Sequence, residues 1–256
     1  MPRIDDATIS IVLDVYPLER ARLIELLSGL NEAQWAQPTE CPAYTVKGIA
    51  SHILGDDLSL LSRQRDGAVQ GLVLMAERMP GAGFRALLDG FNDQWVEAVR
   101  FISPRILLEL LDLVGRWTHC YYGEVDPNAP GEPVALFGVP LGASSPFWHA
   151  IAREYLERWV HHSQIRRALG MASLAEAPFL DVGHAIIATV AGALTGDDTV
   201  PSDDPNEQWT IGPINLGSRA QAADILTLGH RAAQFAELAT GPDDLLREFA
   251  ARVGRQ

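Results

Sequence analysis

Apolar residues recur every three or four positions along most of the first 170 residues, and this period predicts amphipathic α-helices. Capping residues mark where these segments start and stop. Pro17 is favourable in the first turn of a helix, and Thr45 is a good N-cap. Gly170 is favourable as the residue that follows the C-terminal end of a helix. The pairs Ser103-Pro104 and Ser145-Pro146 are further candidates for a cap and a first turn. The helices predicted in this part span residues 17–30, 45–60, 84–101, 106–117 and 145–169.

Long helices with one long crossover loop, here residues 124–144, are typical of a four-helix bundle. Residues 171–178 form a predicted linker. The rest is mixed, with a helix over 179–194, a short strand over 209–211, and helices over 218–238 and 242–253. We therefore expect a mainly α fold. A helical bundle over residues 1–172 is followed by a smaller α+β C-terminal domain over residues 173–256.

The charge balance argues against nucleic-acid binding. The chain has 20 Lys and Arg but 33 Asp and Glu, a formal net charge of -13, and no extended basic cluster. A protein that binds nucleic acid or an anionic membrane surface needs a positive face. No run of 18 apolar residues and no signal-peptide pattern occurs, and the cysteines are Cys41 and Cys120. We therefore expect a cytoplasmic protein with no nucleic-acid or membrane partner and no disulfide scaffold.

The most informative polar residues are Glu157 and His161. They lie four residues apart in the predicted helix 145–169, so both side chains project from one face. A carboxylate and an imidazole at this spacing can hold one metal ion, and burying them is costly unless they are paired or metal-bound. An exposed Glu–His pair is common at the same spacing and is the alternative interpretation. Glu154 lies one turn earlier on the same side.

A second histidine, His52, is a candidate third ligand beside Glu157 and His161. His52 lies near the apolar stripe of the predicted helix 45–60, where a lone histidine is more often a core or edge residue than a ligand. With Glu157 and His161 it would make a site of two histidines and one carboxylate. Three protein ligands leave a fourth position open for water or substrate, which is the pattern of a catalytic zinc. Asp56 either orients His52 from the second coordination shell or is a solvated helix residue.

The other candidate groups are weaker. His162 lies about 100° around the helix from His161, so one metal ion is not expected to use both. Cys41 and Cys120 have no histidine at a spacing that would support a nucleophile. The sequence has no Gly-x-Ser-x-Gly motif and no phosphate-binding loop. The metal site is therefore the main functional hypothesis from the residues themselves.

Two stretches around these residues carry recognisable motifs. The first comprises Trp35, the run Pro38-Thr-Glu-Cys-Pro-Ala-Tyr-Thr-Val46, and His52. The second runs from Arg153 to Arg166 and contains Glu-Arg-Trp-Val-His-His-Ser-Gln-Ile-Arg. Both resemble signatures of the mycothiol-dependent maleylpyruvate isomerase family, in the DinB-like bundle superfamily. Its usual patterns are a Trp, a Pro-Thr-x-Cys-Pro-Gly-Trp-Thr-Val run, a ligand His, and later Arg-x-x-Glu-x-Trp-Val-His-His-x-x-Ile-Arg.

The resemblance implies a fold, a site and a chemistry. The fold is a DinB-like four-helix bundle with a smaller α+β domain behind it. The site is a zinc ion held by His52, Glu157 and His161. A family arginine that helps to bind thiol or substrate would correspond to Arg231, as a catalytic and cofactor-binding residue. The cosubstrate would be mycothiol, whose sulfur is deprotonated by the metal and then attacks an electrophilic small molecule.

The reaction class stays open. Expulsion of the thiol after rotation gives cis–trans isomerisation, and retention of the thiol gives S-transfer. A metal-dependent hydrolase with Glu154 or Asp56 as base, and a non-enzymatic metal-binding or stress-response bundle, are the alternatives. Nickel, cobalt or iron can occupy a similar N/O site in place of zinc. Tyr44 replaces the family's usual Trp and Gln164 a common Asp, which bears on the substrate more than on the metal. A homodimer is a further expectation.

Overall fold

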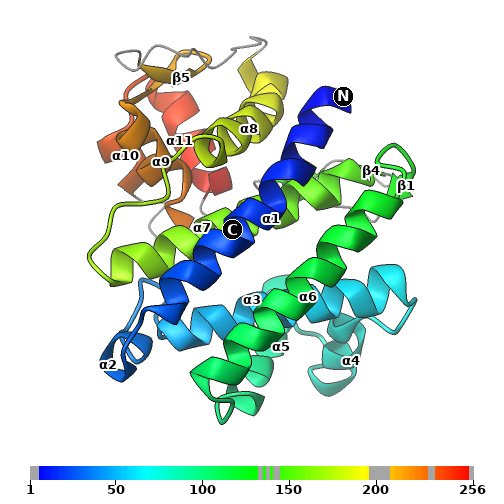
Figure 1. Ribbon diagram of the computed structural model, residues 1–256. Coiled ribbons are helices and arrows are strands. Elements are labelled where there is room, and N and C mark those ends of the chain that lie inside the picture. Colours follow the sequence, from blue (N-terminus) through cyan, green and yellow to red (C-terminus); the bar gives the residue numbers. More distant parts are fainter. Residues whose placement is uncertain are drawn as a thin grey trace. The chain divides into compact units, whose positions relative to one another are not determined.

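The computed structural model describes residues 6–131, 135–136, 139–140, 145–195, 208–229 and 234–253 (Figure 1). These residues are mainly α-helical, with short two-stranded sheets, so the predicted fold class is confirmed. No helix within these ranges is long and apolar enough to cross a membrane. The chain divides into two compact units: Arg20–Glu124, which we call the inserted unit, and Met1–Glu19 with Val125–Gln256, the flanking unit. The domain bounds 1–172 and 173–256 stay a prediction.

The inserted unit is built on helix α3. It begins within α1 (Asp6–Ser28) and continues with α2 (Glu32–Trp35), α3 (Val46–Leu60) and its π-helical extension η1 (Leu61–Arg65), α4 (Gly71–Arg78), α5 (Phe84–Ala98) and α6 (Pro104–Glu124). Helix α3 packs against α5 and α6, and Ile49 and Ile53 of α3 are buried. The hydroxyl of Thr45 accepts a hydrogen bond from the N–H of Gly48, which confirms the predicted N-cap. These contacts fix where α3 begins and which neighbours it has.

An ion pair buried in the inserted unit joins three of its helices. The guanidinium of Arg20 on α1 lies 2.7 Å from Oδ2 of Asp57 on α3, and both side chains are buried. Arg20 also donates to the backbone oxygen of Leu111 on α6. The hydroxyl of Thr118 on α6 donates to the second oxygen of Asp57. The buried charges therefore have several hydrogen-bond partners, which a stable buried ion pair requires.

The flanking unit is built on helix α7. Its helices are α7 (Trp148–Ala168), α8 (Phe179–Thr195), α9 (Arg219–Leu226), α10 (Phe235–Leu238) and α11 (Asp243–Val253). Its antiparallel strand pairs are β1 (Pro130–Gly131) with β4 (Ser145–Pro146), β2 (Ala135–Leu136) with β3 (Val139–Pro140), and β5 (Trp209–Ile211) with β6 (Ile214–Gly217). Tyr155 and Trp159 of α7 are fully buried, and their polar atoms donate to the backbone oxygens of Phe179 and Leu174. The predicted strand 209–211 and the stop at Gly170, which has φ +72°, are confirmed.

The first helix does not begin at Pro17 as predicted. Helix α1 begins at Asp6 and holds Pro17 in its interior. A proline there removes one backbone hydrogen bond and usually breaks or kinks a helix. Here Val12, Val15 and Tyr16, on the turn before the proline, are all buried. Burial of this apolar face offsets the lost hydrogen bond. The position of the proline in the sequence does not reveal this burial.

Two other predicted boundaries are also wrong. Ser145-Pro146 forms strand β4, and α7 begins only at Trp148, because residues 145–146 pair with Pro130–Gly131. Among the described residues of the helix predicted over 218–238, α9 ends at Leu226 and α10 begins at Phe235, with Gly229 at φ +51° after the end of α9. The first boundary is set by pairing with a distant strand, which the local sequence pattern does not contain. The second is set by a glycine in the left-handed region.

The buried ion pair gives a stability prediction. We expect Asp57→Ala to lower the free energy of unfolding by about 3–5 kcal/mol, because it leaves the Arg20 charge buried without its partner. Asp112→Ala is the matched control, since Asp112 forms an exposed ion pair with Arg116 within α6 and should cost less than about 1 kcal/mol. Urea denaturation of both variants measures the difference. Equal, small losses would contradict this role of the ion pair.

His149 gives a prediction on pH dependence. It is 2% exposed beside Trp148, and burial lowers its pKa to about 4. The unfolded chain, with a pKa of about 6.5, binds more protons between these values, so stability is lost as the pH falls below about 6.5. Between pH 7.5 and pH 5 the wild type should lose roughly 2 kcal/mol more than His149→Phe, measured by urea denaturation. Parallel pH profiles of the two proteins would refute this.

Candidate metal centre

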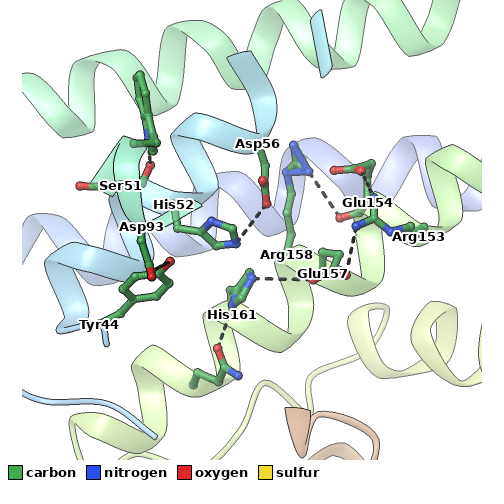
Figure 2. A network of polar contacts seen from close by, with 12 residues as sticks. Tyr44, Ser51, His52, Asp56, Asp93, Arg153, Glu154, Glu157, Arg158 and His161 are labelled. Atoms are coloured by element: carbon green, nitrogen blue, oxygen red, sulfur yellow. Dashed lines mark hydrogen bonds and ion pairs between the residues drawn. The ribbon is translucent and has the colours of Figure 1, made fainter. Parts of the chain in front are cut away.

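The first half of the predicted site lies on α3 in the inserted unit. His52 and Asp56 are four residues apart on one face, with Nε2 of His52 3.3 Å from Oδ2 of Asp56 (Figure 2). Their side chains are 10% and 32% exposed. The next residue, Asp57, is fully buried and pairs with Arg20 instead. The rotation of α3 that buries Asp57 therefore leaves His52 and Asp56 together on another face.

An aromatic ring packs on the imidazole of His52. The ring of Tyr44 stacks on it at a centroid distance of 5.9 Å and an interplanar angle of 28°. The Tyr44 hydroxyl donates a hydrogen bond of 2.9 Å to Oδ1 of Asp93 on α5 (Figure 2). Burial, and then the Asp93 carboxylate, raise the pKa of Tyr44 above its usual range, so the hydroxyl stays protonated. His52 thus has a carboxylate on one side and an anchored ring on another.

Helix α5 is joined to α3 next to this ring. The indole N–H of Trp95 donates a hydrogen bond of 2.7 Å to the backbone oxygen of Ser51, the residue before His52. The Trp95 ring lies so close to Gly55 that a Cβ there would come within 2.5 Å of Cδ1 and Nε1. The absence of a side chain at Gly55 therefore permits the hydrogen bond that holds α5 beside His52.

The second half of the predicted site lies on α7 in the flanking unit. Nδ1 of His161 is 2.8 Å from the side-chain oxygen of Gln164. Because an amide oxygen only accepts hydrogen bonds, Nδ1 carries a proton, and in the neutral imidazole Nε2 then keeps its lone pair. Nε2 is 3.7 Å from Oε2 of Glu157 (Figure 2), and the two side chains are 11% and 17% exposed. Gln164 therefore selects the tautomer in which Nε2 can bind a metal.

Arginines contact the acidic residues of α7. Arg153 lies 3.5 Å from Oε1 of Glu157 and donates a 2.8 Å hydrogen bond to Oε1 of Glu154 (Figure 2). Arg158 is buried and donates to the backbone oxygen of Glu154. The two oxygens of Glu157 are thus divided, one toward Arg153 and the other toward His161. Glu154, which the sequence offered as a possible base, is buried and ion-paired with Arg153.

Each histidine–carboxylate pair has a separation suited to two ligands of one tetrahedral ion. Two bonds of about 2.0–2.2 Å at the tetrahedral angle put their donor atoms about 3.3–3.6 Å apart. The measured separations are 3.3 Å for His52 and Asp56, and 3.7 Å for His161 and Glu157. Imidazole nitrogen and carboxylate oxygen are both ordinary zinc ligands. The residues present on each helix therefore fit an ion of the zinc type.

The remaining candidate residues have other surroundings. His162 is fully buried in the flanking unit, with Nδ1 2.8 Å from Oε1 of the equally buried Glu19. It therefore faces away from the direction of His161, as its position on the helix predicts. Both cysteines are free, Cys41 buried and Cys120 exposed. Arg231 lies outside the described residues.

Comparison with known proteins places the chain in a family. A family model described as the mycothiol maleylpyruvate isomerase N-terminal domain matches residues 16–166, more than half of the chain. The chain belongs to this family. Two uncharacterized proteins from the Mycobacterium tuberculosis strains CDC 1551 / Oshkosh and ATCC 25618 / H37Rv are each 26% identical to it over 203 residues, which is 76% of this chain and 74% of the relative. No solved structure matches it.

The mycothiol maleylpyruvate isomerase family match includes both pairs, and this chain departs from the family pattern beside each of them. Tyr44 replaces the family's usual Trp and contacts His52. Gln164 replaces a common Asp and contacts His161. Sequence reasoning missed Asp93, which anchors Tyr44. No motif marks Asp93, because it is one of several charged residues on α5 and lies far from His52 in the chain. Only the folded contact identifies it.

The packing of α5 on α3 can be tested at Gly55. We expect Gly55→Ala to lower the free energy of unfolding by about 1–3 kcal/mol, because the new methyl group displaces Trp95 and its hydrogen bond to Ser51. Gly123→Ala in α6 is the control, since no atom lies within 4 Å of the added carbon and alanine favours a helix by about 0.5–1 kcal/mol. Chemical denaturation measures both. A Gly55→Ala protein as stable as the wild type would contradict the close packing.

Proposed function

We propose that the protein is a zinc-dependent enzyme that uses a low-molecular-weight thiol, mycothiol, together with an electrophilic small molecule. One observation supports this most directly. The family match over residues 16–166 includes two imidazole–carboxylate pairs, His52 with Asp56 and His161 with Glu157, each spaced like ligands of one ion. The family name suggests the thiol, and the donor atoms suggest the metal.

In this proposal His52, Glu157 and His161 bind one zinc ion. Asp56, which contacts His52 within α3, is a candidate for a fourth ligand. Three protein ligands leave one position open for a thiol, whereas four would close the site. A catalytic role therefore requires that Asp56 is not needed to retain the metal.

The neighbouring residues prepare the ligands for this role. The side-chain oxygen of Gln164 accepts a hydrogen bond from Nδ1–H of His161 and so leaves Nε2 available. Arg153 lies at one oxygen of Glu157 and leaves the other directed at His161. When bound, a zinc ion lowers the pKa of a thiol, so that the sulfur is ionised near neutral pH. We assign Arg231, from the resemblance to the family's C-terminal domain, to binding of the thiol or the substrate.

The thiol distinguishes the proposed reaction from its rivals. Cis–trans isomerisation returns the thiol unchanged, and S-transfer consumes one thiol for each product. Metal-dependent hydrolysis proceeds without a thiol, and a non-enzymatic metal-binding bundle turns nothing over. We place the reaction in the cytoplasm, where low-molecular-weight thiols are kept reduced, and we expect a homodimer.

Metal content is the first test. We expect about one zinc per chain in the wild type after zinc addition and dialysis. His52→Ala and His161→Ala should lose most of it, because each removes one of three ligands. Asp56→Ala should retain it, and His119→Ala, a histidine on α6 outside the proposed ligand set, is the control. Elemental mass spectrometry measures each protein.

Three results would contradict the proposal. A wild type without zinc would remove the metal from the mechanism. A zinc-loaded protein that converts maleylpyruvate, or another electrophile, equally well with and without added mycothiol would point to hydrolysis or another thiol-independent reaction. Loss of zinc from Asp56→Ala would instead indicate a closed, structural site.

A further inference from the structure

We propose that Tyr44 and Asp93 are a positioning pair for His52, with Asp93 holding the Tyr44 ring against the imidazole. This inference rests on the proposed function, because it assigns His52 to the metal. It adds two residues that do not bind the ion and a helix, α5, whose contribution the sequence did not indicate. All of the contacts involved lie within the inserted unit.

The Tyr44 side chain runs along α3 toward His52. Tyr44 immediately precedes the N-cap Thr45. Its ring lies along the first turns of the helix and stacks on His52. A Cβ at Gly48 would lie 3.1 Å from Cβ of Tyr44 and 3.6 Å from two atoms of its ring. Glycine at position 48 therefore leaves the space in which the ring lies, one turn before His52.

A hydrogen bond anchors the far end of the Tyr44 ring. The Tyr44 hydroxyl donates its hydrogen bond to Oδ1 of Asp93, which projects from α5 (Figure 2). Two residues further along α5, Trp95 bonds the backbone oxygen of Ser51. Asp93 is therefore carried by a helix that is itself fixed to the turn of α3 holding His52. The ring is restrained at its Cβ by α3 and at its hydroxyl by α5.

The anchored Tyr44 ring restrains the imidazole of His52. A histidine that binds a metal needs a fixed ring orientation, and residues that orient a ligand typically change metal affinity by about 10–100-fold when they are removed. Asp56 contacts Nε2 of His52 at the edge of the ring, whereas Tyr44 covers its face. Loss of the anchor frees the Tyr44 ring to change rotamer, and His52 then loses the restraint on its face.

Zinc affinity tests the pair through the hydrogen bond. Competition with a chromophoric chelator gives the zinc Kd of wild type, Asp93→Ala, Asp93→Asn and Tyr44→Phe. We expect about 10-fold weaker binding for Asp93→Ala and Tyr44→Phe. Asp93→Asn should remain near the wild type, because its amide oxygen still accepts from the hydroxyl. Asp89→Ala is the matched control, since Asp89 lies one turn earlier on α5 and pairs with Arg85.

The metal-free protein gives a second readout that does not depend on the proposed function. Long-range ¹H–¹⁵N NMR spectra record the ring signals of His52, with those of His149 as an internal reference. We expect Asp93→Ala to shift the His52 signals and Asp89→Ala to leave them in place. If the wild type binds no zinc, the proposed function fails, while a shift of His52 still supports the pair. Unmoved His52 signals in Asp93→Ala, or an Asp93→Asn protein as weak as Asp93→Ala, would overturn the positioning role.

Discussion

The buried ion pair between Arg20 and Asp57 is the contact on which the inserted unit depends most. Two buried charges are stable only when their remaining donors and acceptors also have partners. Leu111 and Thr118 of α6 supply them. One interaction thus joins α1, α3 and α6, and it fixes the rotation of α3 about its own axis. Because Asp56 precedes Asp57 and is four residues from His52, that rotation also decides where the histidine–carboxylate pair points.

In the flanking unit, buried polar side chains likewise orient helix α7. Tyr155, Trp159 and His162 are all fully buried and have polar partners, the last of them a buried glutamate. The side of the helix that carries these residues is therefore buried in the core. Glu157 and His161 lie on a different side and are slightly exposed. On both helices, fully buried polar groups hold the orientation, and the candidate ligands occupy the neighbouring, partly open face.

The features that could be predicted from the sequence have local causes. A cap such as Thr45 acts within one turn, and the spacing of Glu157 and His161 is a property of the helix alone. The predictions that failed depend on distant partners. Pro17 stays inside a helix because its neighbours are buried, and residues 145–146 form a strand because they pair with residues 130–131. Asp93 was missed for the same reason, since its role exists only through Tyr44 on another element.

The separation between His161 and Glu157 is too long for a direct hydrogen bond and close to that of two ligands of one zinc ion. Gln164 fixes the ring proton on Nδ1, so Nε2 and Oε2 of Glu157 both have lone pairs at a separation of 3.7 Å. A proton shared between them would need an N···O distance of about 2.7–3.2 Å. A zinc ion with bonds of about 2.0–2.2 Å to each atom spans nearly the observed distance. Since zinc needs the unprotonated nitrogen, its binding would also compete with protons for Nε2.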